Sequence, residues 1–238
     1  MIKKQFEFNQ HKFSAILPDQ AAESVWVEIF KEREYKAADK TIEEAANAIV
    51  DVGAHVGLFS LYVRALNHVV PIFALEPEDT NFGLLEQNLK ENKLTNIKTL
   101  KIALGGRSEH SNLLISSDSH NHRLEGTPSP VQSDIGEVVQ NNQTIQIYSL
   151  RDFLDINKIK KISLLKMDIE GGEYDVFSAC MPADFARIGA IVMEYHNYGS
   201  QNYKEIESQL RENGFGVQIF PSKFEKKMGF IFAKNKRI

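Results

Sequence analysis

The sequence predicts an α/β fold in which a doubly wound, mostly parallel sheet carries an antiparallel last strand. From residue 49 onward, short apolar runs alternate with amphipathic segments, which is typical of a parallel sheet covered on both faces. The run at 162–167 is apolar enough to be a central strand. Too few residues separate the runs at 215–220 and 228–233 for a crossover helix, so these two strands should pair antiparallel.

Residues 1–47 are expected to form an N-terminal cap of a hairpin and a helix. Residues 5–17 alternate weakly between apolar and polar side chains, which predicts the hairpin. Residues 21–35 have apolar side chains at helical spacing. Trp26 belongs to that apolar set, so we expect it to pack against the core rather than bind a ligand.

Residues 48–238 are expected to form the ligand-binding domain. The predicted strands lie at 49–52, 69–75, 97–102, 162–167 and 188–194, and the predicted helices at 57–66 and 80–92. Residues 107–143 interrupt this rhythm with Ser, Asn, Gly, His and Pro, and only 113–115 looks like a strand. Long insertions are usually functional or disordered, so we interpret this one as a lid or substrate loop, with an inert insert as the alternative.

Composition narrows the possible partners and compartments. The net charge of −4 comes with dispersed Lys and Arg, which disfavours nucleic acid as a partner. Cys180 is the only cysteine, which excludes an intramolecular disulfide and fits a reducing compartment. The N-terminus lacks the apolar core of a signal peptide, and no window approaches the ~18–20 apolar residues of a membrane span. We therefore expect a soluble cytoplasmic protein that does not bind membranes; its oligomeric state is open.

The segment 49–57 has the pattern of a nucleoside-binding strand, loop and helix. An apolar run ends at Asp51, and Gly53 and Gly57 flank His55 before an amphipathic helix whose first amides are free to face a ligand. The D-x-G-x-x-x-G spacing differs from the G-x-G-x-x-G pattern that suits a dinucleotide pyrophosphate. A phosphate-free adenosine ligand, S-adenosylmethionine, therefore fits better than NAD.

A second carboxylate stands at the end of the next strand. The apolar run 69–75 leads into Glu76 and Pro77, and Glu76 follows Gly53 by 23 residues. A carboxylate at that place can accept hydrogen bonds from both ribose hydroxyls. A loop cap for Asp51 and a solvated strand end for Glu76 are the alternatives, but the two acids in register favour a binding site.

Three blocks in this order resemble the FkbM-type family of S-adenosylmethionine-dependent methyltransferases. They are D-V-G-A-H-V-G at 51–57, F-A-L-E-P at 73–77 and L-K-M-D-I-E-G-G-E at 165–173, the last followed by E-Y-H at 194–196. The family more often has Asn at the position of His55. The resemblance implies a class I methyltransferase with a Rossmann-like sheet, and an N-terminal extension over the cofactor cleft that makes Tyr35 a minor candidate for contact.

The resemblance also implies which residues at the strand ends would contact each part of the cofactor. It implies that Asp51 and Gly53 border the methionine portion, that His55 and Gly57 belong to the same loop, and that Glu76 and Pro77 meet the ribose. Ile102 and Ala103 would flank the adenine, and Asp168 would lie where the methyl group is presented.

Methyl transfer from a sulfonium requires orientation and, for an alcohol acceptor, removal of a proton. Asp168 and Glu170 stand at the expected methyl position, and His196 should project to the same side as Glu194. We therefore take His196, Glu170 and Asp168 as catalytic candidates, and we interpret Glu173 as a first-turn acid that complements the helix dipole.

The carboxylates of Asp168, Glu170 and Glu194 and the imidazole of His196 could instead hold a divalent ion. The family does not generally demand metal, so none is assigned. His120 and His122 suggest a metal pair, but no third ligand stands at a recognised spacing; with Arg123 they could instead contact an acidic substrate.

Together these observations predict methylation of a hydroxyl group on a small molecule or saccharide. The alternatives are an NAD-dependent oxidoreductase on a similar sheet and a non-catalytic module that binds an adenosyl ligand.

Overall fold

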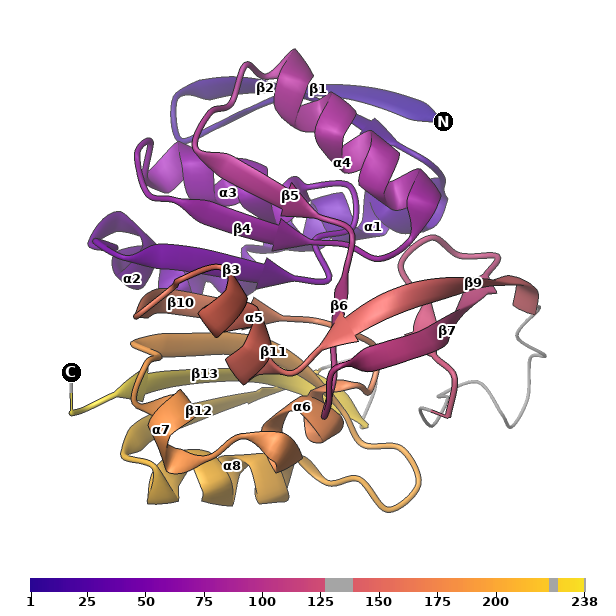
Figure 1. Cartoon of the computed structure of the whole chain (residues 1–238). Coiled ribbons are helices and arrows are strands. Elements are labelled where there is room, and N and C mark those ends of the chain that lie inside the picture. The colour runs from indigo at the N-terminus through magenta and orange to yellow at the C-terminus, as the bar shows by residue number, and fades with distance from the viewer. Residues whose placement is uncertain (127–138, 223–226, 238) are drawn as a thin grey trace.

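The computed structural model describes residues 1–126, 139–222 and 227–237. Among these residues, a central seven-stranded sheet has the order β12-β13-β11-β10-β3-β4-β5 (Figure 1). Its strands are β3 (Ala48–Val52), β4 (Ile72–Leu75), β5 (Ile97–Leu100), β10 (Ile162–Met167), β11 (Ala190–His196), β12 (Phe215–Pro221) and β13 (Met228–Asn235). Neighbours from β11 to β5 run parallel, whereas β13 runs antiparallel to β11 and to β12. The predicted fold class and the antiparallel terminal pair are confirmed.

The order of the strands indicates where a ligand would bind. The chain builds β3, β4 and β5 outward to one side, then returns to place β10 and β11 on the other side of β3. The direction of winding therefore reverses between β3 and β10. In open parallel sheets, ligands bind outside the carboxyl ends of the strands at such a reversal.

Helices cover both faces of this sheet. Alternation along β10 shows the division, because Leu164 packs into one buried cluster and Leu165 into the other. One face is covered by α5 (Leu150–Ile156), α6 (Glu173–Ala179), α7 (Pro182–Phe185) and α8 (Tyr203–Glu212). The other is covered by α3 (Leu58–Leu66), α4 (Asp79–Glu91) and the N-terminal segment. Within the described parts of the chain, no helix combines the length and apolar character needed to cross a membrane.

The N-terminal hairpin forms as predicted, from β1 (Ile2–Phe8) and β2 (His11–Leu17). It is held to α4 by Asn88, whose side chain accepts from the Ile16 amide at 2.8 Å and donates to the Ile16 carbonyl at 3.0 Å. Trp26 is buried, with its ring edge against Phe6. The expectation that Trp26 packs is confirmed.

The predicted helix at 21–35 is divided into three short segments. α1 (Gln20–Val27) leads into a π-helix (Glu28–Glu32), and a 3-10 helix (Glu34–Ala38) precedes α2 (Asp39–Glu43). Arg33, between the π and 3-10 helices, has a left-handed backbone with φ of +60°, which ends the continuous helix. π-helical turns are frequent at functional sites, and this one borders the cavity described below.

The insertion contains more strand than the sequence predicts. β6 (Ala103–Leu104), β7 (Glu109–Ser116), β8 (Arg123–Leu124) and β9 (Val139–Tyr148) form a second sheet in the order β6-β9-β7-β8, which projects from one side of the fold (Figure 1). The expectation of a single strand at 113–115 is therefore wrong. Among the residues whose burial is described, this sheet has a small apolar cluster of its own, made of Ala103, Leu113, Ile145 and Ile147, so few apolar residues mark it in the sequence. Residues 127–138 of the predicted lid lie outside the described residues.

Candidate functional site

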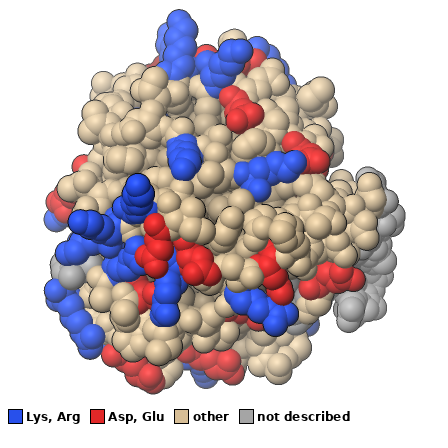
Figure 2. Space-filling model, in the orientation of Figure 1, with Lys and Arg blue, Asp and Glu red and all other residues tan. Residues whose placement is uncertain are grey.

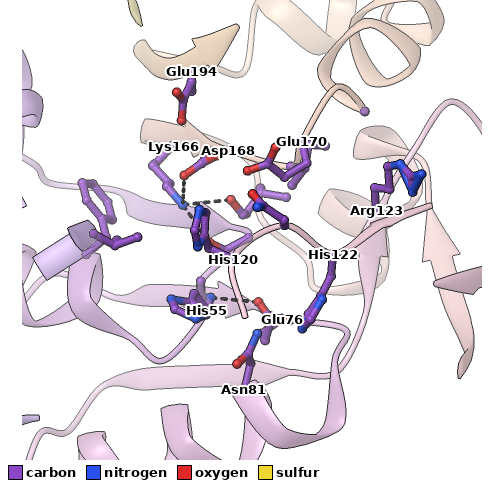
Figure 3. A pocket seen from close by; sticks show the side chains of 18 of the residues that line it. His55, Glu76, Asn81, His120, His122, Arg123, Lys166, Asp168, Glu170 and Glu194 are labelled. Atoms are coloured by element: carbon purple, nitrogen blue, oxygen red, sulfur yellow. Dashed lines mark hydrogen bonds and ion pairs between the residues drawn. The ribbon is translucent and has the colours of Figure 1, made fainter. Parts of the chain in front are cut away.

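A cavity of about 370 Å³ opens at the carboxyl ends of β3, β4, β10 and β11 (Figure 3). Its volume falls in the range of ~300–1,000 Å³ that is usual for small-molecule sites. The wall includes the ends of these strands, the N-terminal segment around 25–35, the loop at 119–124 and the start of β13. The cavity therefore lies where the reversal of the sheet predicts a ligand.

The glycine loop after β3 depends on backbone that few residues adopt. Gly53 has φ of +72°, and a Cβ placed there would lie 2.0 Å from the carbonyl oxygen of Asp168. His55 also has a positive φ, +51°, and lines the cavity. Asn and His tolerate this conformation better than most residues, which explains how His replaces the Asn that is commoner in sequences of this type. Gly57 does not line the cavity; its φ is +89°, and a Cβ would meet the Leu85 side chain at 2.7 Å.

Glu76 is the buried carboxylate at the end of β4. Only 5% of it is exposed, and its oxygens accept hydrogen bonds from the amides of His55 at 2.8 Å and Glu78 at 2.9 Å. Burial raises the pKa of Glu76 to about 7 in spite of these two donors. Because a carboxylate offers about four acceptor positions, Glu76 keeps capacity for hydroxyl groups of a ligand. Pro77, Ile102 and Ala103 line the same part of the cavity.

Asp51 occupies a different place from the one expected for it. It is fully buried and does not line the cavity. Its carboxylate lies 3.4 Å from the ammonium of Lys166 and accepts from the Ser60 hydroxyl at 3.2 Å. Burial raises the pKa of Asp51, although Lys166 opposes that shift. The structure therefore corrects the placement of Asp51 beside the cofactor: it supports Lys166 from behind.

Lys166 is a charged side chain of the cavity wall that the sequence analysis missed. It lines the cavity although it is almost fully buried, and it donates to the carbonyls of Gly53 at 2.7 Å and Val52 at 3.2 Å. Its ammonium also lies 3.9 Å from Asp168. The available signal was a lysine inside an otherwise apolar central strand, because a buried lysine needs a charged partner.

The turn after β10 carries two acids that line the cavity, Asp168 and Glu170 (Figure 3). Glu170 has φ of +53° and is followed by Gly171 with φ of +92°, so two successive residues are left-handed. A non-glycine residue in this conformation costs on the order of 1 kcal/mol and persists where the surroundings hold it. Glu173, the first residue of α6, accepts from the Ile169 amide at 3.0 Å and is fully buried.

His196 does not reach the cavity. It is 0% exposed, and its ring nitrogens lie 3.4 Å from Glu173, 3.6 Å from Glu170 and 3.9 Å from Glu194. Burial favours the neutral imidazole, but these three carboxylates outweigh it and hold the pKa of His196 well above 6.5. The structure therefore corrects the assignment of His196 as a base: its ring lies behind the acids that line the cavity, and its raised pKa disfavours the neutral form that a base requires.

Further acids enter the wall from the N-terminal segment and from β11. Glu28, Glu34 and Glu194 all line the cavity. Burial raises the pKa of each, to about 8 for Glu34, and neighbouring carboxylates, Asp168 among them, add to the shift. Sequence analysis missed Glu28 and Glu34 because a continuous helix would have left them among its solvent-exposed polar residues.

The loop between β7 and β8 closes another side of the cavity. Ser119 joins it to three other segments: its hydroxyl lies 3.0 Å from the His55 ring and donates to Asp19 at 3.1 Å, and its carbonyl accepts from Asn81 at 2.7 Å. Burial lowers the pKa of His55 to about 3, so its ring is neutral.

His120, His122 and Arg123 also line this wall. In the described part of the chain, no group of three or more His, Cys, Asp or Glu residues is arranged to hold a metal ion.

The chain is similar in sequence to known methyltransferases. The family model described as "Methyltransferase FkbM domain" matches residues 51–217. "Methyltransferase 1" of Beauveria bassiana is 23% identical over 185 residues, which cover 72% of this chain and 73% of that protein. "31-O-demethyl-FK506 methyltransferase FkbM" of Streptomyces tacrolimicus is 24% identical over 217 residues, which cover 82% of each.

Two solved structures match the fold with TM-scores of 0.52. The METTL16 MTase domain is 14% identical, with 92% of this chain and 70% of that chain covered. An rRNA methylase from Streptococcus thermophilus is 8% identical, with 87% and 98% covered. At these identities the likeness concerns the fold alone, and it agrees with the class I methyltransferase sheet that the sequence predicts.

Proposed function

Because this chain belongs to the FkbM methyltransferase family, whose model matches most of its length, we propose that it methylates a hydroxyl group of a small molecule or saccharide. Its cofactor is S-adenosylmethionine, as family membership indicates. The observation that carries the proposal is a cavity whose wall includes Glu76 at the end of β4 and Asp168 and Glu170 after β10.

The residues of the cavity fit this cofactor. Glu76 retains acceptor positions that ribose hydroxyls can fill, and its orientation is fixed by the two amides that it already binds. The absence of a side chain at Gly53 lets the glycine loop pack directly against the backbone carbonyl of Asp168. We assign the ribose to Glu76 and Pro77, the adenine to Ile102 and Ala103, and the loop around His55 to the methionine portion.

The cofactor supplies an activated methyl group, so the chain must orient the acceptor and remove its proton. We assign proton acceptance to Asp168, which lines the cavity and is oriented by the ammonium of Lys166. Glu170 can take the same role from the next turn. His196 acts as a positioning residue, because its imidazolium lies beside Glu170 and Glu194 without reaching the cavity.

A small acceptor is supported by two observations. The relative from Streptomyces tacrolimicus is named as a methyltransferase of 31-O-demethyl-FK506. On the face shown in Figure 2, Lys and Arg are interspersed with Asp and Glu rather than gathered into a stripe for nucleic acid. We also propose a cytoplasmic location, which the free thiol of Cys180 fits, and a lid role for the insertion, whose described loop reaches the cavity at Ser119.

The test is an acceptor screen with a trideuteromethyl form of the cofactor, followed by mass spectrometry and NMR to locate the new methyl group. We expect a methoxy product with the wild-type protein and loss of turnover with Asp168→Asn. A methyl group on nitrogen or carbon would refute hydroxyl methylation. Reduction of NAD by any member of the screen would instead favour an oxidoreductase.

A further inference from the structure

The cavity extends past Asp168, away from the proposed ribose position. In the sheet, β11 lies three strand steps from β4, which is about 14 Å at ~4.8 Å per step. Figure 3 shows Glu194 on the opposite side of Lys166 and Asp168 from Glu76. Groups at the β11 end are therefore too far from Glu76 to share the ribose with it. This end of the cavity is available to the acceptor.

The wall at this end is acidic. Glu28 and Glu34 approach from the N-terminal segment, and Glu194 from β11. In the described ranges, neither Glu28 nor Glu34 forms an ion pair, and the buried ammonium of Lys166 in the cavity wall lies 3.4 Å from Asp51. Partly buried carboxylates that repel one another are stabilised by a cation placed among them.

Tyr35 gives an independent indication of a ligand at the same place. It is 3% exposed and lines the cavity, and within residues 1–126, 139–222 and 227–237 its hydroxyl has no hydrogen-bond partner. The hydroxyl oxygen is not among the fully buried polar atoms that lack a partner, so it opens to the space of the cavity. The ring is held edge-on by Phe59 at 4.9 Å and by Phe230 at 5.8 Å. The hydroxyl is therefore held at the cavity wall with its hydrogen-bonding capacity unused.

We propose that Glu28, Glu34, Tyr35 and Glu194 form a subsite for a cationic group on the methyl acceptor, so that the substrate is a hydroxylated ammonium compound such as an amino alcohol or amino sugar. The inference rests on the proposed hydroxyl methylation for its link to the acceptor. Carboxylates neutralise the cation, and the hydroxyl of Tyr35 is available as a hydrogen-bond partner.

Aromatic and apolar side chains suit the rest of such a ligand. Phe230 and Tyr35 present rings at this wall, and aromatic faces attract ammonium groups. Val25 and Ile29 line the cavity beside Glu28 and provide contact for the hydrocarbon part of the acceptor.

The test uses two probes of the same shape, choline and its neutral carbon analogue 3,3-dimethylbutan-1-ol. Binding is measured by NMR titration with S-adenosylhomocysteine present at saturation, so that the cofactor position is filled. We expect the wild-type protein to bind choline about tenfold more tightly than the neutral probe. Glu34→Gln and Glu194→Gln should each remove most of that preference and leave the weak affinity for the neutral probe unchanged.

Glu32→Gln is the matched control, because Glu32 is exposed, lies two residues before Glu34 and is outside the cavity wall. It should retain the preference for choline. Tyr35→Phe removes only the hydroxyl and provides a further variant should a Gln substitution prevent folding. It should weaken the binding of cations that can form hydrogen bonds, such as ethanolamine, more than the binding of choline.

Two results would overturn the proposal. Equal affinity of the wild-type protein for both probes would show that the acids do not select a cation. A fall in S-adenosylhomocysteine affinity in the Gln variants, with the choline preference intact, would assign the acids to the ammonium group of the cofactor. Because these titrations require no turnover, a preference for choline without any methoxy product would refute the proposed hydroxyl methylation and leave the cation subsite standing.

Discussion

Replacement of Glu76 by Ala should weaken binding of the cofactor without affecting the acceptor end of the cavity. The carboxylate is 5% exposed and is oriented by the amides of His55 and Glu78, so it is held in place before the ligand arrives. Hydrogen bonds to a charged group contribute ~1.5–3 kcal/mol. At ~1.4 kcal/mol for each factor of ten, we expect an affinity about 10- to 150-fold weaker.

The same substitution should also lower the free energy of unfolding, because two buried amides lose their acceptor at ~1–3 kcal/mol each. Part of this loss is offset, since burial of the ionised carboxylate is itself unfavourable. The assay is calorimetric titration with S-adenosylhomocysteine at a temperature where the variant is folded. Glu78→Gln is the control, because Glu78 lies outside the cavity wall and Gln can still accept from the Asn81 amide at the start of α4. Unchanged affinity in folded Glu76→Ala would refute the assignment of the ribose.

Three further predictions follow from the same geometry. The pKa of Glu76, about 7 in the free protein, predicts that cofactor affinity falls as pH drops from about 8 to 6, because the protonated carboxyl loses acceptor capacity; a flat calorimetric profile would contradict this. Gly53→Ala should lower the free energy of unfolding, measured by urea denaturation, by more than ~1 kcal/mol. Gly83→Ala should raise it by up to ~1 kcal/mol, because Gly83 lies in α4 and an added Cβ would have no atom within 4 Å. Equal stabilities of the two variants would contradict the close contact between Gly53 and Asp168. Asp168→Asn should reduce kcat by ~10²–10⁴-fold and retain the affinity for the cofactor. The pH profile of the wild-type rate should show no acidic limb from His196, because the pKa of His196 lies well above 6.5. An acidic limb that disappears in His196→Gln would restore His196 as the base.

The strand ends could be predicted from the sequence because each is marked by an apolar run that stops at an acid. This pattern identified Glu76 and Asp168, both of which line the cavity. It could not separate an acid that faces the ligand from one that faces the interior. Asp51 ends the same kind of run but turns inward to Lys166, a distinction that depends on tertiary packing.

Two other features depend on environment rather than on local pattern. His196 has the residue type of a neutral base, but the carboxylates of Glu170, Glu173 and Glu194 surround it and raise its pKa. Glu28 and Glu34 reach the cavity because a π-helical turn and the left-handed Arg33 interrupt the helix. The second sheet escaped prediction because β7 and β9 need only a small apolar core.

In the proposed arrangement, one cavity holds the adenosyl group at Glu76 and presents the methyl group at Asp168. A crystal structure of the protein with S-adenosylhomocysteine tests it most directly. We expect the ribose hydroxyls within hydrogen-bond distance of the Glu76 carboxylate, the adenine between Ile102 and Ala103, and the sulfur atom on the Asp168 side of the glycine loop. A ribose bound away from Glu76, or a sulfur atom that points away from Asp168 and Glu170, would contradict the account.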